Sequence, residues 1–430
     1  TRAPAAASCH RQPFAHSGAR SPLDRCGTAR RQMTASLPER RTVWVTGSAA
    51  YASSGSRGDF WPGLFRAPPT GQSRRVDAEL GLEELIDVKQ LRRLRRHSAL
   101  GVAAARDALH DAGIDGRPPS STAVVIGNAM GDMGNVVEEH AVHTAGYVNR
   151  LSSVFAAQFV PNAPATAIAI AYGLSGHIEG VTAACASGAH AILSAARLIA
   201  HGYADIALAG GAESPLFDAL NAGLLHAGVL ALDAVMRPFD SQRCGFVLSE
   251  GAGMVVLEAS KHARARGATP RATVLGGAVR GEGFHLIAQR RDGSGVETCI
   301  EAALSDARLS AADIVAISSH GTATVSNDLT EARGITQVFP HPPPVIALKG
   351  ATAHCAGASG AIEVAAVVEC FSAATLPPIQ GHVSTDEEIA LDLVLKPRPF
   401  TPGPTLVNSF GLGGHSTSLV IAPPDHDTDR

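Results

Sequence analysis

Aromatic side chains are scarce in this sequence: tryptophan, tyrosine and phenylalanine together make up 4% of its 430 residues. A surface that stacks the bases of single-stranded nucleic acid needs several aromatic side chains, so we do not expect that function. Glycine (44 residues) and alanine are abundant instead, and 45% of all residues are hydrophobic. This apolar content excludes a wholly disordered chain, and small side chains suit parallel sheets that helices cover closely.

Long apolar runs and paired-cysteine motifs are also missing. We find no run of about 18 apolar residues and therefore expect no membrane-spanning helix. The first 32 residues lack the apolar core of a secretory signal. The seven cysteines are odd in number, widely spaced and form no CxxC motif. In a chain of this length that pattern favours free thiols in a reducing compartment, so we expect a cytoplasmic protein.

Negative charge is almost absent from the beginning of the chain. Residues 1–32 contain six arginines and one acidic residue, Asp24, which gives this segment a net charge of +5. The whole chain carries −3, so the remainder carries −8, and an acidic body argues against binding to a nucleic-acid backbone. Residues 1–40 show no periodicity, and we expect a disordered or extended tail with Met33 as the natural initiator. An organelle transit peptide is the alternative interpretation.

Short apolar runs alternate with helical patterns from residue 43 onward. We expect strands at 43–47, 122–127, 206–209, 254–257, 314–318, 345–348 and 419–421. We expect helices at 98–112, 187–202, 295–307, 327–338 and 358–373, and one helix or two shorter ones over 82–97. This alternation predicts βαβ units and parallel sheets, and therefore an α/β fold.

Two segments suggest that the chain is duplicated. Ala183–Ala189 and His354–Gly360 are both short Ala/Gly/Cys segments that lead into an alanine-rich helix. Similar chemistry at two helix starts would give the same likeness without duplication. The polar, basic stretch Lys261–Thr269 could join two halves, which we expect at residues 41–265 and 266–430.

Cys185 is the strongest candidate for a reactive residue. It lies where a turn meets the helix expected at 187–202, and only small residues surround it. Free N–H groups and the dipole at a helix N-terminus stabilise a thiolate, so we expect a lowered pKa for this thiol. The alternative is a buried and inert cysteine, which is the commoner state of a single cysteine.

Two histidines lie on loops that follow expected strands. His320 follows 314–318 and precedes a Gly/Thr loop, and His354 follows 345–348, close to Lys349. Active sites in α/β proteins lie at the carboxyl ends of strands. Either histidine could instead cap a turn or lie on the surface. No metal-ligand spacing or phosphate-binding glycine motif accompanies them.

Six segments form one ordered set of motifs. They are VPNAPATAIAIAYGLSGH (160–177), TAACASGAHAI (182–192), RPFDSQRCGFVLSEGAG (237–253), HGTATVSNDLTEA (320–332), LKGATAHCAGASGAIE (348–363) and NSFGLGGHS (408–416). Over about Thr42 to Ala422, the sequence resembles the β-ketoacyl–acyl carrier protein synthases of the elongating class, in the thiolase superfamily.

The resemblance implies a fold, a reaction and partners. The fold is a thiolase-like pair of duplicated βαβ halves in a layered α-β-α-β-α arrangement. The reaction is a decarboxylative Claisen condensation, in fatty acid or polyketide biosynthesis: an acyl group on Cys185 reacts with malonyl–acyl carrier protein to give 3-oxoacyl–acyl carrier protein. No cofactor and no metal are implied. The implied partners are an acyl carrier protein bearing acyl and malonyl groups and a second subunit, in a homodimer or a ketosynthase heterodimer.

The resemblance also assigns roles at the reacting atoms. Cys185 would take the acyl group, and the backbone N–H groups of Cys185 and Phe410 would form the oxyanion hole. His320 and His354 would hydrogen-bond the carbonyl of the malonyl thioester and stabilise the enolate formed as carbon dioxide leaves. The side chain of Phe410 would line or gate the acyl pocket, with core packing as the alternative.

Further residues would support this chemistry. Lys349 would orient the site and pair with Glu363 on the following helix. Thr322 and Thr324 would contact the pantetheine arm. Phe246 would line the acyl pocket, and core packing is again the alternative.

A basic cluster is the expected docking site for an acidic carrier protein. Lys89, Arg92 and Arg93 lie where related synthases place such residues, and opposite charge would steer the carrier to them. The alternative is an ordinary solvated helix end, which applies equally to Arg95 and Arg96.

The cysteine and the two histidines discriminate within the superfamily. Degradative thiolases use Cys/His/Cys, initiating synthases use Cys/His/Asn, and chain-length-factor partners lack the cysteine. The sequence departs from the family at Leu412, where phenylalanine is frequent, at Cys244, where aspartate is frequent, and over Phe284–Arg291, an entrance loop that is usually rich in alanine and proline. A non-condensing partner subunit and a thioester hydrolase are the alternative functions.

Overall fold

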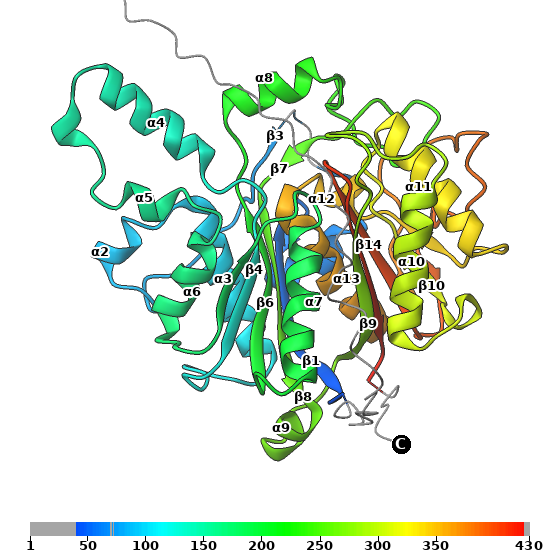
Figure 1. Ribbon diagram of the computed structural model, residues 1–430, viewed down its shortest axis with the longest axis horizontal. Helices are drawn as coiled ribbons and strands as arrows, with labels where there is room; N and C mark the ends of the chain where they lie inside the picture. The colour runs from blue at the N-terminus through cyan, green and yellow to red at the C-terminus, as the bar shows by residue number, and fades with distance from the viewer. Residues whose placement is uncertain (1–39, 69–70, 72, 425–430) are drawn as a thin grey trace, which may run out of the picture. The chain divides into compact units, whose positions relative to one another are not determined.

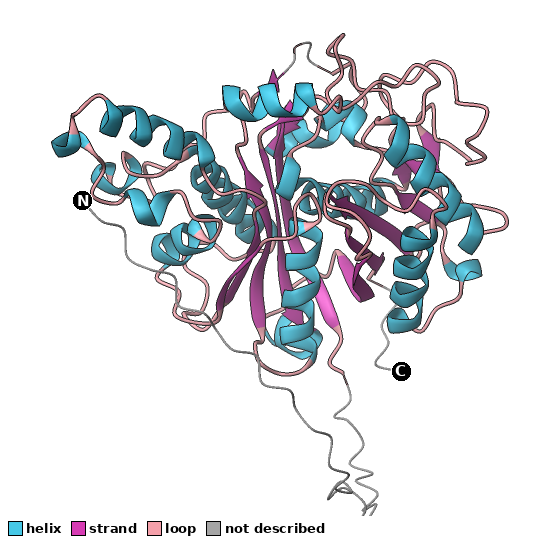
Figure 2. Ribbon diagram, turned by 45° about the horizontal axis from the view of Figure 1, so that its top comes forward, coloured by secondary structure: helices cyan, strands magenta, loops and turns pink. Residues whose placement is uncertain are grey.

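The structure is a computed structural model that describes residues 40–68, 71 and 73–424, so the tail expected at residues 1–39 lies outside the described chain. A mixed sheet of eleven strands runs through the part of the chain that is described (Figures 1 and 2). Its strands are β1 (Val43–Ala52), β2 (Gly55–Ser56), β4 (Ala123–Gly127), β5 (Ile178–Val181), β6 (Ile206–Glu213), β8 (Gly251–Ala259), β9 (Ala272–Gly281), β10 (Ala316–Ser318), β11 (Val345–Ile346), β14 (Thr405–Gly411) and β15 (His415–Ala422). Their hydrogen-bonded order is β11-β10-β14-β15-β9-β1-β8-β6-β4-β5, and β2 pairs with β1.

Helices and two small strand pairs complete the described elements. The α-helices are α1 (Phe60–Gly63), α2 (Val88–Leu91), α3 (Arg96–Asp111), α4 (Met133–Thr144), α5 (Phe155–Gln158), α6 (Ala163–Tyr172), α7 (Ser187–Ala200), α8 (Asp218–His226), α9 (Ser260–Ala265), α10 (Ser294–Ala307), α11 (Val325–Val338), α12 (Lys349–Thr352) and α13 (Ser359–Ala373). The 3-10 turns are η2 (Arg57–Asp59), η3 (Val148–Arg150), η4 (Ala311–Asp313) and η5 (Ala356–Ala358). The small pairs are β3 (Ser73–Arg74) with β7 (Leu248–Ser249), and β12 (Thr375–Leu376) with β13 (Arg398–Pro399).

Three apolar clusters show how helices and strands are layered. One cluster joins α7 and α13 to strands on both sides of β1, so these two helices lie between the halves of the sheet. A second joins α3 and α6 to the outer face of β4, β6 and β8, and a third joins α10 and α11 to β10, β14 and β15. The expected thiolase-like α-β-α-β-α arrangement is therefore confirmed, and Figure 1 shows α7 between the two outer helix groups.

The direction of the strands differs from the expectation of parallel sheets. Within the eleven-stranded sheet, only β5-β4-β6 and β11-β10-β14 are parallel, while β8, β1, β9 and β15 between them run antiparallel to their neighbours. The other expected helices and strands are present, but over 82–97 only α2 and the first two residues of α3 are helical. A connection of three residues joins β14 to β15, and so short a link permits only an antiparallel pair. Residues 261–269 connect β8 to β9, and the division into halves at residue 265 remains a prediction.

The helix α13 is mostly apolar, apart from Glu363 and Glu369, and is almost wholly buried. Together with the preceding turn it forms an 18-residue segment, Ala356–Ala373, that is long and apolar enough to cross a membrane. The segment includes Glu363 and Glu369, so it is not an uninterrupted apolar run, and 83% of it is buried inside the protein. A position between the two halves of the sheet requires a mostly apolar helix, so α13 is a core helix.

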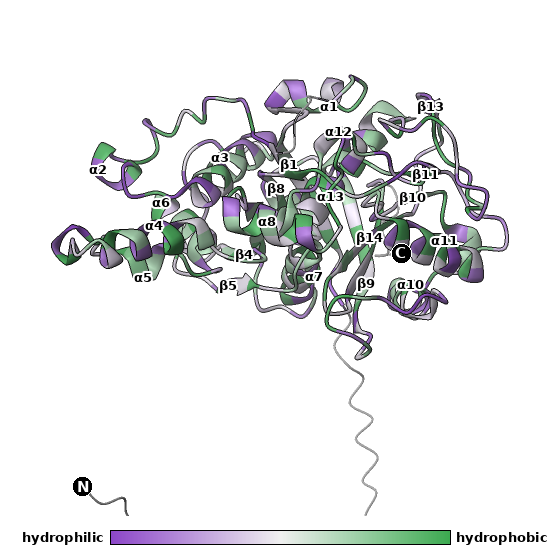
Figure 3. Ribbon diagram, turned by 90° about the horizontal axis from the view of Figure 1, so that it is seen from above, coloured by the Kyte–Doolittle hydropathy of each residue, from purple (hydrophilic) through white to green (hydrophobic). Residues whose placement is uncertain are grey.

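A peripheral region carries α2, α4 and α5. In Figures 1 and 3 these three helices extend to one side of the sheet. Only Asn135 of α4 is buried. Arg95 ties α4 to the start of α3, because its guanidinium contacts Asp132 at 2.6 Å and Glu138 at 3.0 Å.

Candidate active site

A strained turn places Cys185 just before α7. Ala184 has a positive φ of 48°, which is unfavourable for alanine. The Ser187 hydroxyl accepts a hydrogen bond from the Ala183 N–H (2.8 Å) and donates to the Ala184 carbonyl (2.6 Å). These bonds hold the turn closed and place Cys185, a partly buried residue, at the N-terminal end of α7.

The imidazole of His354 lies against this sulfur. Its Nε2 is 3.2 Å from Cys185 Sγ, and its Nδ1 is 3.0 Å from the Ser359 hydroxyl. The preceding Ala353 has φ 57° and ψ −174°, a region of backbone conformation that is essentially restricted to glycine. The structure therefore holds His354 in place through unfavourable backbone geometry.

His320 faces the same space. Its ring centroid is 5.6 Å from that of His354, and the two rings are nearly perpendicular at 83°. Lys349 Nζ contacts His320 Nδ1 at 3.2 Å and its carbonyl at 2.6 Å, and it forms an ion pair with Glu363 at 2.5 Å. The structure thus brings together the cysteine, both histidines, Lys349 and Glu363.

Both imidazoles are neutral in this site. Burial lowers the pKa of His320 and of His354 well below the usual value, and the positive charge of Lys349 lowers both further. Lys349 has only protons to offer to His320 Nδ1, so that nitrogen must be the acceptor and the ring proton is on Nε2. His320 therefore presents a hydrogen-bond donor to the site.

The pKa of Cys185 differs from our expectation. Burial raises it to about 11, and the nearby positive charge of Lys349 only partly offsets this effect. Our sequence argument considered the helix N-terminus but not the loss of solvent around the sulfur, which disfavours the charged form. At rest, Cys185 is therefore a thiol, and it needs a base at the moment of reaction.

Two backbone amides point at the sulfur. They belong to Cys185 itself and to Leu412, and both lower the pKa of the thiol. Phe410, the expected second donor, lies two residues earlier inside β14, opposite Ser416 of β15. The strand ends at Gly411, where a Cβ would lie only 3.1 Å from the Cys185 nitrogen, so the turn brings the next amide to the sulfur. The ring of Phe410 packs edge-on to His320 at 5.7 Å.

Two buried carboxyl groups of α11 are site residues that our sequence reasoning missed. Glu331 accepts hydrogen bonds from the backbone N–H groups of His320 (2.8 Å) and Gly321 (2.9 Å). Asp328 accepts from those of Phe239 (2.8 Å) and Ala323 (3.1 Å). Burial raises the pKa of Glu331 to about 7 and that of Asp328 to about 6. The signal was available, because two acids three residues apart share one face of a helix directly after the His320 motif.

The remaining predicted residues lie in two places. Thr322 and Thr324 share a hydrogen bond of 3.0 Å beside His320, and Phe246 packs edge-on to His354 with ring centroids 5.0 Å apart. Lys89 lies on α2, and the residues Arg92 and Arg93 directly follow that helix. All three basic residues are exposed, on the peripheral region rather than beside the sulfur.

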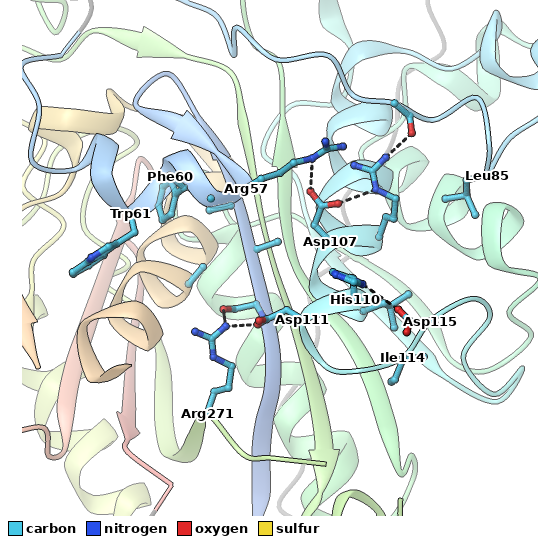
Figure 4. Close-up of a pocket in the computed structure, with 18 of the residues that line it drawn as sticks. Arg57, Phe60, Trp61, Leu85, Asp107, His110, Asp111, Ile114, Asp115 and Arg271 are labelled. Carbon is cyan, nitrogen blue, oxygen red and sulfur yellow. Dashed lines mark hydrogen bonds and ion pairs between the residues drawn. The ribbon is translucent and has the colours of Figure 1, made fainter. Parts of the chain in front are cut away.

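A separate cleft of about 1200 Å³ lies between β1, α1, α3 and α13 (Figure 4). Its arginines pair with carboxylates inside the cleft: Arg57 contacts Asp107 at 3.2 Å, and Arg271 contacts Glu369 at 2.9 Å and also Asp111. None of the predicted site residues lines it, and we assign it no reaction. Among the described residues, no cluster of His, Cys, Asp and Glu side chains could hold a metal ion.

Comparison with known proteins defines the class first. The structure matches that of the ishigamide ketosynthase/chain length factor with a TM-score of 0.82 and 30% sequence identity, covering 89% of this chain and 99% of the other. It matches a type II polyketide ketosynthase in complex with its acyl-carrier protein, AntDE:AntF, with a TM-score of 0.81 and 27% identity over 90% of this chain. The fold is therefore that of thiolase-like ketosynthases, which are acyltransferases.

The family follows from the sequence comparisons. Residues 70–263 match the family model of the β-ketoacyl synthase N-terminal domain, and residues 271–382 match that of the C-terminal domain. The chain is 35% identical to 3-oxoacyl-[acyl-carrier-protein] synthase 2 of Rhizobium meliloti (strain 1021) over 366 residues, 80% of this chain and 85% of that protein. It is 36% identical to nodulation protein E of Rhizobium leguminosarum bv. trifolii over 348 residues, 79% and 85% of the two chains. The chain belongs to the β-ketoacyl synthase family, as the resemblance implied.

Proposed function

We propose that this protein carries out a decarboxylative condensation on acyl carrier thioesters, with Cys185, His354 and His320 at the reacting atoms. The observation that carries the proposal is the convergence of these groups: the sulfur lies 3.2 Å from one imidazole, and a second neutral imidazole faces the first. A hydrolase would need a water molecule positioned for attack, but it would not need a second imidazole to donate a hydrogen bond to an enolate. Two imidazoles and two amides suit two separate oxyanions.

In the first half-reaction, the acyl group moves from the carrier to the cysteine. His354 Nε2 takes the proton of the Cys185 thiol as the sulfur attacks the thioester carbonyl, because the raised pKa leaves no thiolate at rest. The N–H groups of Cys185 and Leu412 stabilise the tetrahedral oxyanion. The carrier thiolate leaves and takes up the proton, so a thioester and a thiol exchange places.

In the second half-reaction, malonyl carrier loses carbon dioxide. The electron pair of the broken C–C bond forms an enolate, whose oxygen accepts hydrogen bonds from the Nε2–H groups of His320 and His354. For this step the ring proton of His354 moves from Nδ1 to Nε2, and Nδ1 accepts a hydrogen bond from the Ser359 hydroxyl. The enolate carbon attacks the acyl carbonyl on Cys185, and the sulfur leaves and is protonated again. Malonyl and acyl thioesters with one proton give a 3-oxoacyl thioester, a free carrier thiol and carbon dioxide.

Other residues bind and orient the substrates in this proposal. Thr322 and Thr324 contact the pantetheine arm, which must pass close to His320. The rings of Phe246 and Phe410 line the acyl pocket, since each packs edge-on to one of the histidines. Burial and the charge of Lys349 keep both imidazoles neutral, and Lys349, paired with Glu363, orients His320.

Mass spectrometry of the intact protein after exposure to acyl carriers tests the proposal. The parent protein should gain one acyl group, release carbon dioxide from malonyl carrier and yield a lengthened acyl carrier. Cys185→Ala should lose both the acylation and the lengthened product, whereas Cys244→Ala, at the other described cysteine with an exposed side chain, should retain them. Free acid as the product would establish a hydrolase instead, and an inert isolated chain that becomes active only with a homologous subunit would establish a non-condensing partner.

We propose that an acyl carrier protein docks beside α2. No ion pair with a described residue is found for Lys89, Arg92 or Arg93, in contrast to Arg95 and Arg96, which contact acidic side chains. An adjoining pocket of about 230 Å³ has a largely apolar lining, which includes Ile86, Leu94, Ala163, Ala167 and Ile170. Basic side chains without an ion pair, next to an apolar pocket, can bind an acidic helix that also carries an apolar side chain. Acyl carriers are acidic.

We propose that a second copy of the chain pairs with β5. This strand has one described neighbour, β4, so the backbone groups of its other edge are unpaired in the single chain. Ile178 of β5 is an exposed apolar residue, as are Val137, Tyr147 and Val148 of the peripheral region. Unpaired edges and exposed apolar surface are features that proteins normally cover. A heterodimer with a related subunit is the other outcome of the test described below.

A further inference from the structure

Glu213 is a buried carboxyl group that the mechanism above does not use. It is the last residue of β6 and has no solvent exposure. Its Oε2 accepts hydrogen bonds from the backbone N–H groups of Ala129 (2.6 Å) and Gly357 (3.2 Å). Its Oε1 has no hydrogen-bond partner among the described residues. A buried carboxyl group with one free oxygen is costly, so it needs an explanation.

The two amides belong to segments that meet at the site. Ala129 follows β4, and Gly357 lies in η5, three residues after His354. Gly357 also touches α7, because a Cβ at Gly188 would lie 2.8 Å from the Gly357 carbonyl oxygen. The turn that carries His354 and the helix that begins beside Cys185 are therefore packed backbone to backbone, and Glu213 is bonded to that junction.

We propose that Glu213 is a positioning residue that clamps the turn after His354 to the loop after β4, and so sets the distance between the His354 imidazole and the Cys185 sulfur. The proposal rests on Cys185 and His354 reacting as a pair, as described above. One carboxyl oxygen holds both amides, so a side chain of the same length is needed. Shortening it releases the turn, and small misplacements of a reacting group reduce rates strongly.

Because of the protonation state of Glu213, substitutions can change the length of this side chain separately from its charge. Burial raises its pKa to about 8, so the carboxyl group is largely neutral at pH 7. When it is ionised, its charge raises the pKa of Cys185. At pH 7, Glu213→Gln therefore keeps the length, the acceptor oxygen and the neutral charge, whereas Glu213→Asp removes one methylene and with it the reach to both amides.

The rate of Cys185 alkylation by iodoacetamide at pH 7 tests the proposal in a Cys244→Ala background, where Cys185 is the described cysteine left with an exposed edge. Glu213→Gln should react at close to the parent rate, and Glu213→Asp about ten-fold more slowly. Glu213→Ala is a second shortened variant with the same expectation. In a His354→Ala background the difference between the Asp and Gln variants should disappear, because the clamp acts through that imidazole.

Three results would overturn the proposal: an Asp variant that reacts like the parent, Asp and Gln variants that slow equally, or a difference that persists without His354. Glu258→Gln is the matched control. Glu258 is also buried, but it pairs with Arg266, and it lies in β8 at the end far from Gly251, the residue opposite Glu213. This variant should lower the melting temperature without changing the alkylation rate. Alkylation needs no thioester, so failure of this proposal is distinguishable from failure of the condensation.

Discussion

Unfavourable backbone conformations surround the reactive side chains at the scale of single residues. Ala184 precedes Cys185, Ala323 lies three residues after His320, and Ala353 precedes His354; all three have positive φ. Alanine avoids this region because its Cβ meets the backbone. Such strain persists only where the surrounding structure enforces it, and its cluster here marks the site independently of the identities of the reactive residues.

Replacing Ala353 by glycine should relieve this strain, and the free energy of unfolding measures the relief. The native φ of 57° with ψ of −174° costs alanine roughly 1–3 kcal/mol, and glycine loses about 0.5–1 kcal/mol more entropy on folding. We expect the free energy of unfolding in urea to stay level or rise by about 1 kcal/mol. Ala366→Gly, at a buried position inside α13, is the control and should lose about 1 kcal/mol or more. Equal losses in both variants would mean that Ala353 is unstrained.

At the scale of elements, a buried ion pair joins α12 to α13. Lys349 at the start of α12 and Glu363 in α13 are each 1% exposed and lie 2.5 Å apart. Their charges hold the two helices together around His320. Such a pair contributes little net stability, but either partner alone is a buried, uncompensated charge.

Glu363→Leu should therefore lower the free energy of unfolding by about 3–5 kcal/mol. The double variant Lys349→Met/Glu363→Leu should recover most of this loss, since an apolar pair of similar size replaces the ionic one. Urea unfolding of the parent, both single variants and the double variant gives the coupling energy. Losses that simply add up in the double variant would contradict the assignment. Condensation activity should stay low in every variant without Lys349.

At the scale of the whole molecule, the proposed docking of the carrier depends on the positive charge beside α2. Lys89→Glu should weaken carrier binding about ten-fold at low salt and much less at high salt, because screened charges attract weakly. Lys396→Glu, an exposed lysine elsewhere, is the matched control and should bind like the parent. Isothermal titration with the carrier measures both. Acylation of Cys185 from a small thioester should be equal in all three proteins, and a loss there would point to misfolding rather than docking.

The proposed pairing through β5 predicts a dimer. The parent chain should sediment as a dimer, and Ile178→Lys should sediment as a monomer, because a charge on an edge strand opposes strand pairing. Leu395→Lys is the control, since Leu395 is similarly exposed, with 47% accessible against 45% for Ile178, but lies far along the chain from β5. A parent chain that sediments as a monomer alone and forms a dimer only with a related subunit would establish the heterodimer.

The sequence by itself determined the order of helices and strands and the residues of the reacting set. Periodicity, glycines and helix starts are properties of a few neighbouring residues, so the strand at 122–127 and the helix at 187–202 could be predicted and are present as β4 and α7. The motifs around Cys185, His320 and His354 are likewise local. Their resemblance to β-ketoacyl synthases carried the fold and the family.

Tertiary structure alone decided the chemistry that depends on distant partners. Cys185 and His354 are 169 positions apart, and the raised pKa of the thiol comes from its burial in the folded protein. The amide of Leu412 rather than that of Phe410 reaches the sulfur because β14 ends at Gly411 and the turn begins at Leu412. Glu213 and Glu331 acquired their positions through amides of other elements. Solvent exclusion and hydrogen-bond partners arise only when separate segments pack, and no local pattern encodes them.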